Sequence, residues 1–154
     1  MEQKNGFKAL DKSLYWTGGL YLLTAFHHYY GSVVYGTPWR AHVVLLGGMT
    51  FLLCLLLAWQ YRRSGKKLWL YSYLIIAVLM FGTGIGLFEG LYNHVVKNLL
   101  YFAGMNRDSW RIMFPAPAYE VPENFLFEAS GVLQFVVGIG QIRSVYKTYQ
   151  SFKK

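Results

Sequence analysis

Four apolar runs, each long enough to cross a lipid bilayer, constrain the fold of this chain more than any other feature. About 20 helical residues, at about 1.5 Å per residue, cover a hydrocarbon core about 30 Å thick. We expect membrane spans at about residues 14–35, 42–61, 68–88 and 123–145. The third run continues as an amphipathic helix to about residue 102, and the proline-containing segment 103–122 is expected to form an outer loop. With 55% hydrophobic and only 14% charged residues, the chain is predicted to be an all-α integral membrane four-helix bundle, a single transmembrane domain covering residues 1–154.

The basic residues are distributed unevenly between the two ends of these spans. Eleven of the 15 lie near the termini or in segment 62–67, and the other four, on the side of the outer loop, are Arg40, Lys97, Arg107 and Arg111. Cytoplasmic loops of membrane proteins carry an excess of lysine and arginine. We therefore place both termini in the cytoplasm, with the chain in a bacterial cytoplasmic (inner) membrane. Topology explains the net charge of +8, so we expect the partner to be the lipid bilayer and not nucleic acid.

The third span ends in a glycine-rich stretch that carries an ionisable residue. Gly82, Gly86 and Gly90 recur every four residues, which places small residues on one side of a helix and lets a neighbouring backbone approach closely. Glu89 falls on that same side. Because a carboxylate inside a bilayer is energetically costly, it indicates a function, and we predict Glu89 as a catalytic residue.

All four histidines lie in the outer half of the predicted bundle or at its outer surface. On the first helix, His27 and His28 share a polar arc with Thr17 and Thr24, and such an arc must face protein instead of lipid. One outward-opening pocket can therefore collect residues from several helices. The candidate metal ligands are His27, His28, His42, Glu89, His94 and Glu128.

The chemistry of these side chains points to a transition metal. Imidazoles and carboxylates without a thiolate suit zinc, iron or copper. Glu89 and His94 lie about 140° apart on an ideal α-helix, so both reach one ion only if the helix bends, for which Gly90 is the candidate position. Two alternatives stay open: a b-type haem held by two histidines, and a metal-free site in which Glu89 and a histidine act as acid and base.

Two classes of function fit these residues. The first is a membrane protein whose pocket binds a transition metal and acts on a lipophilic small molecule by redox or hydrolytic chemistry. The second is a non-catalytic accessory or assembly subunit that packs its glycine and aromatic faces on a larger membrane complex. A haem, quinone or lipid-binding protein is a further alternative. Thiol–disulfide chemistry is excluded because Cys54 is the single cysteine.

Overall fold

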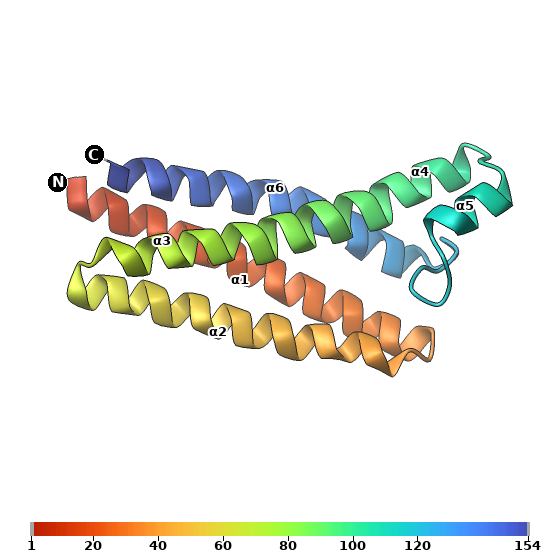
Figure 1. Cartoon of the computed structure of the whole chain (residues 1–154), viewed down its shortest axis with the longest axis horizontal. Helices are drawn as coiled ribbons and strands as arrows, with labels where there is room; N and C mark the ends of the chain where they lie inside the picture. The colour runs from red at the N-terminus through yellow and green to blue at the C-terminus, as the bar shows by residue number, and fades with distance from the viewer. Residues whose placement is uncertain (1, 154) are drawn as a thin grey trace.

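The structure, a computed structural model, describes residues 2–153 and is helical, with no strand in that range. Both termini lie at one end, and α1, α2, α6 and the rod formed by α3, η2 and α4 lie lengthwise beside one another (Figure 1). The elements in chain order are α1 (Glu2–Val34), η1 (Pro38–Arg40), α2 (Ala41–Ser64), α3 (Lys67–Ile76), η2 (Ala77–Val96), α4 (Lys97–Phe102), α5 (Arg107–Met113) and α6 (Phe125–Lys153).

Three helical segments within residues 2–153 are long and apolar enough to cross a membrane, namely Pro38–Ser64, Lys67–Phe102 and Phe125–Lys153. They contain the spans predicted from the second and third apolar runs, and the fourth from residue 125 onward. The first predicted span lies in α1, which is long enough but is not one of the three. Its polar side chains explain this difference. Thr17, Thr24 and His27 are fully buried between the helices, so the residues that lower its hydropathy do not face outward.

The helices extend beyond the apolar runs that predict them. α1 begins at Glu2 instead of near residue 14, and α6 continues to Lys153 instead of ending near residue 145. Lysine, arginine and glutamine are good helix formers, so a helix continues where its hydropathy falls. The apolar runs therefore predict the membrane part of each helix and not its ends.

The segment 103–122 is not a loop throughout, because α5 lies within it. Asn106 caps this helix: its side-chain oxygen accepts hydrogen bonds from the backbone N–H groups of Asp108, at 2.9 Å, and Ser109, at 3.3 Å. Asparagine is a favoured N-cap and aspartate is favourable in a first turn. Asn106 and Asp108 therefore indicate the start of a helix within the segment that was predicted as a loop.

The rod from Lys67 to Phe102 changes its winding in the middle. In η2 the backbone hydrogen bonds span five residues, as in the bond from the Lys97 N–H to the Tyr92 carbonyl oxygen. A turn of this π type is wider than an α-helical turn, so residues five apart in sequence come to nearly the same side. Glu89 and His94 therefore reach the same side of the rod through continuous wide turns, and not through the bend predicted at Gly90.

The predicted glycine stripe packs against α6. A Cβ added at Gly86 would lie 2.9 Å from the Cα of Gly138, so the two backbones are in direct contact. Gly90 lies even closer to the backbone of Phe135. This approach holds η2 against α6 and sets the positions of the functional side chains on both.

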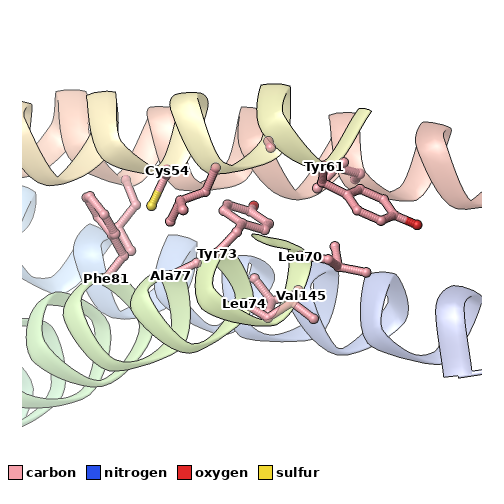
Figure 2. Packing of buried hydrophobic residues seen from close by; sticks show 12 residues of the cluster. Cys54, Tyr61, Leu70, Tyr73, Leu74, Ala77, Phe81 and Val145 are labelled. Atoms are coloured by element: carbon pink, nitrogen blue, oxygen red, sulfur yellow. The ribbon is translucent and has the colours of Figure 1, made fainter. Parts of the chain in front are cut away.

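An apolar core fills the half of the molecule toward the termini (Figure 2). Cys54, Tyr73 and Phe81 are buried there, and the Tyr73 hydroxyl lies 2.7 Å from Ser13 Oγ. Cys54 is a free thiol among the described residues and packs as a small apolar side chain. The polar site lies beyond Phe81, toward the end of the molecule remote from the termini.

Candidate metal centre

One oxygen and two nitrogen atoms converge on a point between α1 and η2. His27 Nε2 lies 3.1 Å from His94 Nε2, and Glu89 Oε1 lies 3.6 Å from the first and 3.7 Å from the second. A circle through three atoms with these separations has a radius of about 2.0 Å, which matches the distance of about 2.0–2.2 Å from zinc to imidazole nitrogen or carboxylate oxygen. His27, Glu89 and His94 are therefore a group that could hold a metal ion.

A hydrogen bond on the far side of His27 fixes which ring nitrogen carries its proton. Ser130 has one hydroxyl proton, and Ser130 Oγ donates it to the Phe127 carbonyl oxygen, 2.9 Å away. The same Oγ lies 2.9 Å from His27 Nδ1, so it accepts the Nδ1–H. In the neutral ring, Nε2 then carries a free lone pair directed at Glu89 and His94.

A carboxylate orients His94 in the same way. His94 Nδ1 lies 2.8 Å from Glu128 Oε2, and because an ionised carboxylate only accepts, Nδ1 is the donor. The two neutral imidazoles then turn bare Nε2 lone pairs toward each other across 3.1 Å, which is repulsive unless a proton or a cation lies between them. Metal-ligating histidines show this pattern, with the other ring N–H donated to an acceptor behind the ring.

Glu128 pairs with a buried lysine. Lys97 Nζ lies 2.7 Å from Glu128 Oε1 and 2.9 Å from the backbone oxygen of Glu120, and Lys97 is only 1% exposed. Because an unpaired charge is costly in the interior, each of the two charges stabilises the other. Lys97, Glu128 and His94 form a chain of contacts from the segment after α5 to the converging atoms.

Two further groups contact Glu89. Asn93 Nδ2 donates to Glu89 Oε2 at 2.7 Å, so Oε1 is the oxygen that faces the imidazoles. His28 Nε2 lies 3.6 Å from the same Oε1. His28 is therefore adjacent to the group of three, although it is not one of its members.

A cavity of about 280 Å³ borders this group. Glu89 and His94 line it together with Arg40, which is buried, and Phe88, which is 55% exposed on the outer side of η2. Tyr119 lines it from the segment after α5, where burial raises the pKa of its phenol above the usual value. The cavity therefore borders the converging atoms with both apolar and polar side chains.

Aromatic packing and a glycine position the two imidazoles. Phe127 stacks on His27 with ring centroids 4.2 Å apart, and it meets His94 nearly edge-on at 5.2 Å. A Cβ added at Gly131 would overlap the His94 ring, so this ring occupies space that only glycine leaves free. α6 thus supplies an aromatic wall and a recess, as well as the acceptors from Ser130 and Glu128.

The structure brings five of the six predicted ligands together. Three form the converging group, His28 contacts Glu89, and Glu128 binds the far side of His94. His42 is in neither the group nor the cavity lining. It is exposed at the start of α2, where its Nδ1 lies 2.9 Å from the Trp39 carbonyl oxygen.

Of the residues that orient the ligands or their partners, Glu128 was predicted as a ligand, whereas Asn93, Lys97 and Ser130 were missed by sequence reasoning. Asn93 follows Glu89 by four residues and Lys97 follows His94 by three, spacings that place side chains one helical turn apart. That spacing is a signal that could have found both. Ser130 gives no such signal, because its partner His27 lies on α1, far away in the sequence.

Comparison with protein-family models, with curated proteins and with solved structures finds no match for this chain. The geometry of the converging atoms is therefore the basis for assigning a function.

Proposed function

We propose that the chain is an integral membrane metalloprotein that binds one divalent transition metal through His27, Glu89 and His94. One observation carries this proposal. Two imidazole lone pairs and a carboxylate oxygen surround a point about 2.0 Å from each, and both rings are already oriented by hydrogen bonds on their far sides.

In this proposal α1 is a fourth membrane span and completes a four-helix bundle around the metal. Leu22, Phe26 and Val33 are exposed on α1, so this side can face lipid while the polar side faces the other helices. Both termini lie in the cytoplasm, as the positions of the basic residues favour, and the membrane is the bacterial inner membrane. The metal then lies in the outer half of the bilayer.

Two imidazoles and one carboxylate are the ligand set of catalytic zinc sites and of non-haem iron(II) sites, both of which keep a further position open. Copper(II) also accepts imidazole ligands. A haem held by His27 and His94 does not fit, because their Nε2 atoms lie 3.1 Å apart with Glu89 Oε1 within 3.7 Å of both, which leaves no room for a macrocycle.

An open metal position beside the cavity supports hydrolytic or redox chemistry on a lipophilic molecule. A metal-bound water becomes a nucleophile near neutral pH. His28 lines the same cavity and lies 3.6 Å from Glu89, so it is placed to exchange a proton with a molecule bound there. Glu89, predicted as catalytic, acts in this proposal as a metal ligand at the reacting centre.

Metal analysis of protein purified without a histidine tag tests this function. We expect about one zinc or iron ion per chain, and loss of the metal in His27→Ala, Glu89→Gln and His94→Ala. His42→Ala and Glu123→Gln are matched controls that keep the metal, because both side chains are exposed outside the group. Absence of stoichiometric metal from the wild type, or equal loss in the controls, contradicts the proposal.

An accessory subunit of a larger membrane complex is the competing function. The outer face of α2 exposes Leu45, Met49 and Leu52, which suit contact with lipid or with another membrane helix. Purification in mild detergent distinguishes between the two proposed functions. A metalloprotein keeps its metal as an isolated chain, whereas an accessory subunit migrates with a larger complex and tolerates Glu89→Gln.

A further inference from the structure

A second cavity, of about 510 Å³, lies between α1 and α6 in the half of the molecule toward the termini. Along α6 its lining changes from apolar, at Phe135, Val136 and Ile139, to basic, at Arg143 and Lys147. Residues 135–147 cover about 18 Å of helix at about 1.5 Å per residue. The groove is therefore an elongated surface with an apolar end and a cationic end.

Three cations gather at the basic end. Lys12 of α1 lines the groove with Arg143 and Lys147. Among the side chains that the structure describes, none of the three forms an ion pair, and Asp11 pairs with Arg62 instead. All three cations are exposed, so their positive charge is available to a ligand.

Trp16 and Gly140 lie at the boundary between the apolar part and the basic part of the groove. A Cβ added at Gly140 would overlap the Trp16 ring, so this indole rests directly on the backbone of α6. Tryptophan is enriched where the hydrocarbon core meets the lipid headgroups. Val136 and Ile139, on the apolar side of this junction, are 58% and 37% exposed. The groove thus runs from hydrocarbon depth to headgroup depth.

We propose that this groove binds an anionic phospholipid, with its phosphate at Lys12, Arg143 and Lys147 and an acyl chain along Val136 and Ile139. Basic pockets between membrane helices bind acidic headgroups in this way. The cations favour an anionic lipid over a zwitterionic one, and the apolar end favours a lipid over free phosphate. No residue of the metal centre takes part, so either proposal can fail alone.

Native mass spectrometry of the full chain, released from detergent with phosphatidylglycerol or phosphatidylcholine, tests this binding. We expect the wild type to retain phosphatidylglycerol in preference. The triple variant Lys12→Gln, Arg143→Gln, Lys147→Gln is expected to bind it about fivefold more weakly for each cation removed. The double variant Val136→Ser, Ile139→Ser is expected to weaken retention with no change of charge.

A charge-matched control removes the same number of cations from the end of α2, the turn and the start of α3. The variant Arg63→Gln, Lys66→Gln, Lys67→Gln lies outside the groove lining and is expected to retain the lipid. Circular dichroism checks helix content, and if the groove triple unfolds, Arg143→Gln compared with Arg63→Gln answers the same question. Equal weakening in both variants of a pair, no preference for phosphatidylglycerol in the wild type, or its displacement by inorganic phosphate overturns the proposal.

Discussion

Lys97 and Glu128 place two opposite charges in the interior, and the second of them binds His94. Removal of one partner of a buried ion pair leaves the other charge unpaired and costs about 3–5 kcal/mol, whereas apolar replacement of both is often neutral. A gain in stability is therefore a weak explanation for the presence of this ion pair. Its specific effect here is to give the His94 N–H a charged acceptor, which makes the opposite nitrogen a better metal ligand.

This role predicts how substitution of Glu128 changes metal affinity. We expect Glu128→Gln to lower the affinity about 10–100-fold, because a neutral amide holds the His94 N–H less strongly. Combining it with Lys97→Met removes the unpaired charge, so the free energy of unfolding recovers while the affinity stays low. Chelator competition measures the affinity and thermal unfolding the stability. Full recovery of affinity in the double variant would mean that Glu128 does no more than neutralise Lys97.

Substitution of Gly131 is a second case in which we expect the metal affinity and the stability to change independently. In Gly131→Ala the new methyl group overlaps the His94 ring, so the ring must move and the metal affinity is expected to fall at least tenfold, about 1.4 kcal/mol. Gly19→Ala is the control, because a Cβ there meets nothing within 4 Å. The control should keep its metal and gain up to about 1 kcal/mol of helix propensity. Metal titration measures the affinity of both variants. Equal affinities would show that the position of the His94 ring is unimportant for metal binding.

At the scale of single residues, polarity and helix spacing were enough to select His27 and Glu89 as inward-facing, whereas His94 was expected to join them only if the helix bends. The polar arc of α1 and the glycine side of the third span point there because a polar group facing lipid is costly. His42 was selected for its residue type and its place at the outer start of the second span, and it is exposed there. The proton positions on His27 and His94 could not be predicted, since they depend on Ser130 and Glu128 from a helix distant in the sequence.

Contact between η2 and α6 depends on glycine backbones that touch. We expect Gly86→Ala to destabilise the protein by about 1–3 kcal/mol, because its Cβ meets the Gly138 backbone, which cannot rotate away as a side chain can. Gly84→Ala, two residues away in the same helix, is the control, since it is exposed and its nearest contact is at 3.4 Å. Chemical unfolding in detergent measures both. Equal stability of the two variants would contradict the importance of this contact.

The apolar runs predicted where the helices lie, but they did not predict the π-type winding of η2. Hydropathy depends on composition and reports which segments are buried in lipid or protein, so the three most apolar helices were found. The π-type turns of η2 cannot be read from composition, because the same residues are compatible with α-helical turns. The expected angle between Glu89 and His94 therefore assumed standard winding, and the need for a bend followed from that assumption.

The whole molecule combines three strongly apolar helices with one, α1, whose polar side is buried. Whether α1 spans the membrane determines on which side the N-terminus lies. Cysteines introduced by Asn5→Cys, Ser109→Cys and Ser151→Cys, each at an exposed position and in a Cys54→Ala background, test this with a membrane-impermeant maleimide on spheroplasts. We expect only the cysteine at position 109 to be labelled, because basic termini stay in the cytoplasm. Labelling at position 5 without labelling at position 151 would mean that α1 does not cross.

The order of synthesis adds a consequence to the way the ligands are shared among helices. A ribosome makes His27 long before Glu89, His94 and Ser130 exist. The buried hydroxyl and imidazole groups of α1 therefore lack their hydrogen-bond and ligand partners until η2 and α6 have been synthesised. We expect the ion to bind firmly only after α6 has packed, because Ser130 and Glu128 of that helix orient the two imidazoles.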